Sequence, residues 1–372
     1  MATLLPPPGT PLAEIDTPAL ILDLDVLERN IATVHDFFRN RPAKVRSVTK
    51  GHKSPEIARL QMASDGAVPG GLCCTKVSEA EIMVEAGATS IRMIEQVVGA
   101  VKLARLAQLA RRAEIIALVD DIRHVDDLAQ AAETQGVTLG VMVEIDIGLR
   151  RCGVQPGAAA IALAQYVMRH QRLRFMGISG HETSTGIADP AARLARQRAH
   201  FQRLVDTRAN LERAGIAVAI CASGASGAWK IAGTTEGITE IEPGAYALMD
   251  YGLQQSSPEI GLDIALTVLA SVISRPVPER AVLDCGHKMI GLNTSGGLPG
   301  VRGLPGAAVN RLNSEHGILD LADDAQALRI GDKVELLPWY YGSAVNANDH
   351  YIGVRAGVVE CVWRIAARGA HT

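Results

Sequence analysis

The sequence predicts an α/β fold, a (β/α)8 TIM barrel, followed by a C-terminal domain that is mostly β. Over the N-terminal part of the chain, eight short apolar runs alternate with amphipathic stretches. Near Ser256 this alternation gives way to strand-like segments separated by Gly and Pro. The 372 residues are enough for one large barrel and an appended domain, each with its own core.

Each predicted strand of the barrel is a mostly continuous apolar run, which is typical of strands buried on both faces of a parallel sheet. The eight runs are Lys44–Thr49, Val68–Cys73, Thr89–Glu95, Glu114–Val119, Thr138–Asp146, Arg174–Ser179, Ala217–Ala222 and Ile238–Glu242. A doubly wound sheet usually has fewer strands and a Gly-rich first turn, which this sequence lacks. The alternation therefore favours the barrel.

The stretches between these runs have apolar residues at three- and four-residue spacing, which predicts helices with one buried face. They are Ser54–Met62, Lys76–Ala86, Val98–Arg112, Ile122–Gln135, Pro156–His170 and Pro190–Ala214. A further helix is expected at Leu27–Phe38, after the strand-like segment Pro18–Asp25. That segment either starts the barrel or adds a strand to the β domain, and the sequence does not decide between the two.

The C-terminal domain is predicted from strand-like segments of alternating character. They are Ile264–Ser274, Arg280–Asp284, Lys333–Leu337 and Tyr351–Ile365, and the Gly/Pro-rich stretch Gly296–Gly306 between them is expected to be a loop. We therefore expect a barrel domain over residues 18–255 and a β domain over residues 256–372, which residues 1–17 join in one version of this division.

Composition excludes several classes of function. Lys and Arg number 37 and Asp and Glu 40, so the net charge of −3 gives no electrostatic footprint for nucleic acid. Aromatic residues make up 3% and leave few platforms for stacking bases. No apolar run approaches membrane-spanning length and no signal peptide is recognisable. Six cysteines without a CxxC pair fit a reducing cytoplasm rather than a disulfide framework.

Polar side chains follow five of the predicted strands, at the rim where a barrel enzyme has its active site. Strand one ends at Lys50, strand five runs into Arg150 and Arg151, and strand six runs into His181 and Glu182. The seventh strand is followed by a loop of small residues, Ser223, Gly224, Ala225, Ser226 and Gly227, and the eighth by Glu242, Pro243, Gly244, Ala245 and Tyr246.

Two features of this rim together suggest pyridoxal 5'-phosphate. The small-residue loop is expected to open a helix, and its backbone N–H groups favour a phosphate; Gly244 and Ala245 offer further donors. Lysine is scarce, with eight in the chain, and a lysine at a buried strand end is suited to form a Schiff base. Taken alone, Lys50 fits a solvated surface lysine better, and the loop fits a flexible loop equally well. Their combination on one rim indicates the cofactor.

Five segments resemble the alanine-racemase-type (fold type III) PLP enzymes, and most closely their D-threonine aldolase/D-serine dehydratase branch. They are Thr17–Leu20, Lys50–Ala58, Asp146–Val154, Glu242–Tyr246 continuing through Met249-Asp250, and Asn313–Gly317. They span almost the whole chain. The resemblance implies a PLP-binding barrel with a β domain, in an enzyme that is usually a homodimer.

The resemblance also implies roles for individual residues. Lys50 takes the place of the Schiff-base lysine, Ser223–Gly227 that of the phosphate loop, and His181 that of a histidine close to the ring. Arg151 resembles the arginine near the cofactor's phenolic oxygen or the substrate carboxylate, with Arg150 as the competing candidate. Glu242 stands where the racemases have an arginine and related decarboxylases a glutamate facing the pyridine nitrogen. A carboxylate there keeps the nitrogen protonated and favours lyase chemistry, although a solvated loop glutamate is the alternative.

The sequence departs from the branch at its metal site. The aldolases and dehydratases usually have a Pro-Asn-His-x-Cys or Asp motif whose His and Cys or Asp bind a divalent metal. Here Tyr340 falls at the histidine position and Gly342 at the Cys or Asp position, and neither is a plausible metal ligand. We therefore expect no metal at that site; Asp349 and His350 lie nearby in sequence and leave a shifted site open.

The sequence thus predicts a PLP-dependent lyase that acts on a small β-hydroxy D-amino acid, with Lys50, His181, Arg151 and Tyr340 as candidate catalytic residues. Retro-aldol cleavage to glycine and an aldehyde is the first hypothesis, with Tyr340, Tyr341 or His181 handling the hydroxyl. A dehydratase of the D-serine or 3-hydroxyaspartate type is the alternative. Racemisation or epimerisation, with Lys50 and a tyrosine on opposite faces, is another, and a non-catalytic PLP-binding protein comes last. Ordinary packing is the alternative for both tyrosines.

Overall fold

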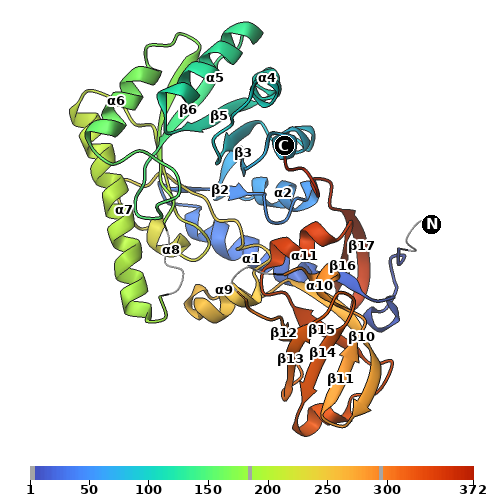
Figure 1. The fold of residues 1–372 in the computed structure, drawn as a ribbon. Helices are drawn as coiled ribbons and strands as arrows, with labels where there is room; N and C mark the ends of the chain where they lie inside the picture. The colour runs from blue at the N-terminus through green and yellow to red at the C-terminus, as the bar shows by residue number, and fades with distance from the viewer. Residues whose placement is uncertain (1–4, 183–186, 293–295) are drawn as a thin grey trace. The chain divides into compact units, whose positions relative to one another are not determined.

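The computed structural model describes residues 5–182, 187–292 and 296–372 (Figure 1). The chain divides into two compact units. The barrel unit contains residues 32–50, 55–244 and 370–372, and the β unit contains residues 1–31, 51–54 and 245–369. The domain division into 18–255 and 256–372 stays a prediction, because compact units of contacts do not establish which segments fold independently. No helix among the described residues has the length and apolar composition needed to cross a membrane.

The barrel unit is the predicted closed parallel barrel, and its eight strands pair in sequence order. They are β2 (Lys44–Val48), β3 (Ala67–Cys74), β4 (Ser90–Met93), β5 (Glu114–Val119), β6 (Leu139–Glu144), β7 (Leu173–Ser179), β8 (Ile220–Ala222) and β9 (Glu240–Ile241). The barrel closes where β2 pairs with β9, through Lys44 with Glu240 and Val45 with Ile241. Every predicted strand is present, and most are shorter than predicted because the apolar runs continue into the loops at one or both ends of the strand.

Helices connect the strands, and Figure 1 shows α4, α5 and α7 on the outside of the barrel. They are α2 (Pro55–Met62), α3 (Val77–Glu85), α4 (Ala100–Leu109), α5 (Ile122–Gln135), α6 (Ala158–Val167), α7 (Pro190–Arg213) and α8 (Trp229–Ala232), and α1 (Leu24–Phe38) precedes β2. Helix α5 shows how the sequence sets these bounds. The Asp121 carboxylate accepts from the N–H of Arg123 at its start, and Gly136 ends it with a φ of 64°.

The β unit is built around one sheet with the strand order β13-β14-β11-β10-β1-β16-β17, and β15 and β12 extend from β10. Its strands are β1 (Ala19–Asp23), β10 (Leu266–Val277), β11 (Arg280–Leu283), β12 (Gly300–Val301), β13 (Ala307–Leu312), β14 (Gly317–Leu321), β15 (Lys333–Leu337), β16 (His350–Arg355) and β17 (Val358–Arg364). Strand β1 pairs with β10 and β16. The segment Pro18–Asp25 therefore contributes to the β sheet, the second of the two possibilities.

Short helices complete the β unit. They are α9 (Tyr251–Ser256), α10 (His287–Ile290) and α11 (Tyr341–Ala347), with 3-10 turns at Leu12–Glu14, Pro258–Ile260 and Asp323–Ala327. Its core packs Ile21 of β1 against Leu269 of β10 and Ile352 of β16. The barrel core instead gathers Ile116 and Leu118 of β5 with Met142 of β6.

The structure corrects two details of the predicted β domain. The single segment Tyr351–Ile365 is a hairpin of β16 and β17, because Ala356 and Gly357 between them have φ angles of 49° and 78° and reverse the chain. The expected loop Gly296–Gly306 contains the two-residue strand β12, which pairs with Leu336 and Leu337 of β15. A two-residue strand in a Gly-rich stretch has no alternation of apolar and polar residues, and so the sequence did not predict this pairing.

Candidate active site

Lys50 follows β2 at the rim of the barrel. Its side chain is exposed, yet the protein atoms around it lower the pKa of its amine, and the charge of Arg151 lowers it further, against opposing effects of Glu79, Glu242 and Glu95. The preceding Thr49 donates a hydrogen bond of 2.5 Å from its hydroxyl to Glu79. An accessible amine with a lowered pKa is a nucleophile for an aldehyde.

Glu242 lies just beyond β9, is buried, and takes part in a charged network. Its Oε1 lies 2.6 Å from an Nη of Arg92 on β4, a guanidinium whose side chain is 0% exposed. The other Nη of Arg92 lies 2.6 Å from Glu240, which also pairs with Arg46 of β2 at 2.8 Å. Burial alone raises the pKa of Glu240, but Arg92 and Arg46 outweigh it and bring that pKa to about 2. Glu242 is therefore part of an ion-pair chain rather than a solvated loop residue.

The loop from Ser223 to Gly227 presents its N–H groups to an anion. The Glu182 carboxylate accepts from the N–H of Ala225 at 2.7 Å and of Gly224 at 3.3 Å. Gly224 has a φ of 102°, and a Cβ there would lie 2.5 Å from the Cβ of Ala232. Such successive N–H groups form an anion-binding nest, and a carboxylate of the same chain fills it here.

The structure bears on two expectations about this loop and its neighbours. The helix after it, α8, begins only at Trp229 and has four residues, so the loop's own N–H groups bind the anion rather than a helix terminus. Gly244 ends the barrel segment, whereas Ala245 and Tyr246 belong to the β unit, where Tyr246 is fully buried. The structure thus groups Gly244 with Ser223–Gly227 in one unit and assigns the other two residues to the second unit.

Arg151 lies at the same rim, near the acidic side chain of Glu144. One of its Nη atoms lies 3.8 Å from Glu144 at the end of β6, and its charge lowers the pKa of Lys50. The neighbouring Arg150 is exposed and has a φ of 59°, with its N–H donated to Asp146. Of the two arginines, Arg151 is thus the one whose positive charge acts on Lys50 and lowers its pKa. His181, after β7, is half-buried beside Glu182.

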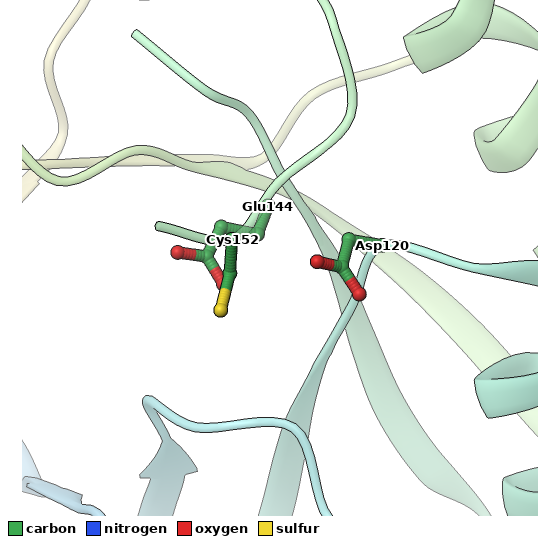
Figure 2. A group of neighbouring side chains, drawn as sticks. All are labelled: Asp120, Glu144 and Cys152. Atoms are coloured by element: carbon green, nitrogen blue, oxygen red, sulfur yellow. The ribbon is translucent and has the colours of Figure 1, made fainter. Parts of the chain in front are cut away.

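Figure 2 shows Glu144 with Asp120 and Cys152, whose ligand atoms all lie within 4.8 Å of one another. Burial raises the pKa of Glu144. Burial also raises the pKa of the Cys152 thiol, as do Glu144 and Asp120, so that it holds its proton. Among the described residues this is the one such group of three ligand-type side chains. Asp349 and His350 belong to none, and the Asp349 carboxylate pairs with Arg368 at 2.5 Å.

The β unit holds the two candidate tyrosines at the start of α11. The centroids of their rings are 5.5 Å apart, and the ring planes make an angle of 61°. The Tyr340 ring also covers Gly342, because a Cβ on Gly342 would lie 2.8 Å from its Cζ and Oη. Burial raises the pKa of Tyr340, and Asp250 raises it further. Tyr341 is buried, and a Cβ added to Gly51 would lie 1.8 Å from its hydroxyl oxygen.

An apolar cavity of about 80 Å³ lies beside Tyr340 in the β unit. Trp339, Leu292 and Leu298 line it, with Ile290, Leu312 and Ser343, and the rest of its lining is Gly and Pro. The described lining contains no charged side chain. This part of the β unit is suited to an apolar group.

Comparison with known proteins identifies the family. Residues 22–252 match the family model described as alanine racemase, N-terminal domain, and residues 265–354 match the one described as putative serine dehydratase domain. D-threonine aldolase of Arthrobacter sp is 37% identical, over 98% of this chain and 97% of that protein. The chain belongs to the D-threonine aldolase/D-serine dehydratase branch of the alanine-racemase-type PLP enzymes.

Two further comparisons place it within this branch. 3-hydroxy-D-aspartate aldolase of Paracoccus denitrificans (strain Pd 1222) is 35% identical, over 97% of this chain and 94% of that protein. The crystal structure of D-threonine aldolase from Filomicrobium marinum has a TM-score of 0.94 and 39% identity, over 99% of this chain and 100% of that one. The protein is a PLP-dependent lyase, and the predicted fold and cofactor are thereby confirmed.

The residues of the barrel unit fit pyridoxal 5'-phosphate. The nest at Gly224 and Ala225 already binds an anionic group, the Glu182 carboxylate. The Lys50 amine is accessible with a lowered pKa, and Glu242 offers a buried carboxylate beyond β9. This lyase therefore has a nucleophilic amine, an anion site and a carboxylate in one unit.

Sequence reasoning missed Arg46, Arg92, Glu240 and Glu182. The first three side chains are buried inside the barrel and pair with one another from strands far apart in sequence. Their signal was a charged residue within an otherwise apolar strand, since an unpaired charge is rarely buried. The sequence predicted Glu182 to lie at the rim, after the sixth strand, but no pattern in the neighbouring residues related it to the loop after β8.

Proposed function

We propose that this lyase cleaves a small β-hydroxy D-amino acid to glycine and an aldehyde without a divalent metal at the branch's usual site. The observation that supports this most directly is the pair Tyr340 and Gly342. The Tyr340 ring fills the space that a side chain at position 342 needs. We infer that the two differences from the branch's metal motif go together.

Each residue has a part in this proposal. When bound, pyridoxal 5'-phosphate supplies an electron sink for the charge that develops at Cα. Lys50 binds the cofactor and later moves a proton at Cα, Arg151 orients the cofactor or the substrate carboxylate, and Glu242 faces the pyridine nitrogen. In this proposal the phosphate is held by Ser223, Gly224, Ala225, Ser226 and Gly227 together with Gly244, Ala245 and Tyr246.

In the cleavage, a base takes the proton of the β-hydroxyl, the Cα–Cβ bond breaks, and the aldehyde leaves. The electron pair of the broken bond stays at Cα, which then takes up a proton to give glycine. His181 is suited to be the base, whereas Tyr340 holds its proton because its pKa is raised and is suited to donate a hydrogen bond to the substrate oxygen.

Dehydration is the second candidate. A dehydratase needs an acid that protonates the leaving hydroxyl, and the phenol of Tyr340 is the candidate for that step. The match of residues 265–354 to the putative serine dehydratase domain points in the same direction. D-serine and 3-hydroxyaspartate are the substrates to test for this reaction.

The test is proton NMR of the holoenzyme with D-threonine, D-serine or D-3-hydroxyaspartate in D2O, with and without chelator. Glycine and an aldehyde in the presence of chelator support the proposal. A 2-oxo acid and ammonia establish dehydration instead. Loss of the α-proton signal alone, with appearance of the enantiomer or epimer, leads to a racemase. Activity that disappears with chelator and returns with a divalent cation refutes the metal-free part.

Lysine attachment is tested separately by borohydride reduction of the yellow holoenzyme and peptide mapping. We expect the label on Lys50. Lys53 is the matched control, since it lies three residues away but is 3% exposed; a label there would overturn the assignment. We also propose a cytoplasmic homodimer. All six cysteines are thiols, as a reducing compartment requires, and light scattering after gel filtration measures the oligomeric state.

A further inference from the structure

Arg92 connects the candidate cofactor carboxylate with the interior of the barrel. It projects from β4, its side chain is completely buried, and its two Nη atoms lie 2.6 Å from Glu240 and 2.6 Å from Glu242. Glu240 has a second cation, Arg46, at 2.8 Å. Two guanidinium groups and two carboxylates thus alternate in a chain that ends at Glu242.

The two carboxylates differ in how they are neutralised. Glu240 lies between two arginines, whereas in this chain of ion pairs Glu242 has Arg92 alone. Among the described residues, the contact with Arg92 and the 3.9 Å approach of the Cys73 thiol are both made at Oε1 of Glu242. The second carboxylate oxygen is therefore available to another partner while Arg92 holds the first.

We propose that Arg92 is a positioning residue that shares Glu242 with the ring nitrogen of the cofactor and so limits how strongly that nitrogen holds its proton. This inference rests on the proposed function, which places Glu242 against the ring nitrogen. A carboxylate already paired with a permanent cation attracts a second proton-bearing group less strongly. The guanidinium keeps its charge, since its pKa is raised by Glu242 and Glu240 in spite of its burial.

Other titratable groups near Glu242 are Cys73 on β3, Lys50 after β2 and Glu144 on β6. Burial raises the pKa of Cys73 to about 12, so the thiol is neutral. All three groups stay unchanged in the variants below. A difference between those variants therefore reports on the arginines and glutamates of the chain.

The test is 15N NMR of the holoenzyme loaded with ring-15N pyridoxal 5'-phosphate, titrated with pH. Arg92→Met is expected to raise the apparent pKa of the ring nitrogen by about one unit, because a cation beside its counter-ion is lost. Arg46→Met removes a buried cation that forms its ion pair with Glu240 and otherwise donates to Ser90, and it is expected to change that pKa by less than about 0.3. Arg92→Lys is expected to return the value towards wild type.

Two further variants keep the test decisive. If Arg92→Met does not fold, Arg92→Met with Glu240→Gln removes one charge of each sign and is expected to give a smaller shift in the same upward direction. Glu242→Gln is expected to lower the ring-nitrogen pKa. An unchanged signal in Glu242→Gln overturns the inference by removing Glu242 from the ring, while the product analysis by proton NMR still decides the reaction. Equal shifts in Arg92→Met and Arg46→Met, or no shift in Arg92→Met, overturn the role of Arg92.

Discussion

The ring of Tyr340 lies over Gly342, so that a Cβ on Gly342 would be 2.8 Å from Cζ of that ring and 2.8 Å from its hydroxyl oxygen. Each residue therefore accounts for the other. A side chain at position 342 requires the Tyr340 ring to move or to be replaced by a smaller residue, and the ring in its present place requires glycine. The two departures from the branch's metal motif are in this sense one structural change.

Gly342→Asp alone is expected to destabilise the protein by about 1–3 kcal/mol, because the new side chain collides with the Tyr340 ring, which must move away. Combined with Tyr340→His, the same substitution is expected to recover most of that loss and to create a binding site for Mn²⁺ or Zn²⁺. Thermal unfolding with and without the metal measures both effects. If the double variant is no more stable than Gly342→Asp, the two positions are independent.

Gly51 provides a second such relationship, with Tyr341. Gly51→Ala places a Cβ 1.8 Å from the Tyr341 hydroxyl and 2.3 Å from Cζ, and we expect a loss of about 1–3 kcal/mol in the free energy of unfolding. Tyr341→Leu removes the colliding atoms, and so the double variant Gly51→Ala, Tyr341→Leu is expected to be more stable than the sum of the two single changes. Denaturant unfolding of the four proteins gives the coupling; additive losses would contradict the contact.

The barrel was predictable because its strands are buried on both faces and their apolar runs are long and continuous, as in Glu114–Val119, whose predicted and observed bounds agree. The hairpin at Ala356 and Gly357 was not, since only one of its two turn residues is a glycine. The four-residue helix α8 shows a similar limit, because a single turn has no periodicity to read.

The site was predictable to the extent that its residues follow strands. Lys50 and Glu242 stand at strand ends, where the barrel geometry collects them. The partners Arg92 and Glu182 were not predictable. The ion pair between Arg92 and Glu242 joins β4 with the end of β9. The Glu182 carboxylate accepts from Ala225, which lies 43 residues later in the chain. Side-chain pairs across a barrel depend on register and rotamer, which local sequence does not specify.

Asp250 makes the stability of the protein depend on pH. Burial raises its pKa to about 6, against two backbone N–H groups that lower it. The folded protein therefore holds the proton more tightly than the unfolded chain, and the stability present below pH 4 is lost as the pH rises to about 6. Asp250→Asn keeps the oxygen that accepts from the N–H of Leu253. We expect it to remove a decline of about 2–3 kcal/mol between pH 4 and 6, measured by urea unfolding; Asp121→Asn, at an exposed cap, should retain the decline.

Glu182 is expected to compete with the cofactor's phosphate. Its carboxylate accepts from the N–H groups of Gly224 and Ala225, which are the donors that a phosphate on this loop would use, and two anions cannot share them. Glu182→Gln removes the charge and leaves a neutral side chain that is displaced more readily, and we expect the apo protein to bind pyridoxal 5'-phosphate about tenfold more tightly. Fluorescence titration of apo protein with the cofactor measures the affinity, and Glu236→Gln, an exposed glutamate, controls for net charge. Weaker binding in Glu182→Gln would mean that the carboxylate supports the loaded loop, and equal binding in all three proteins would place the phosphate on other donors.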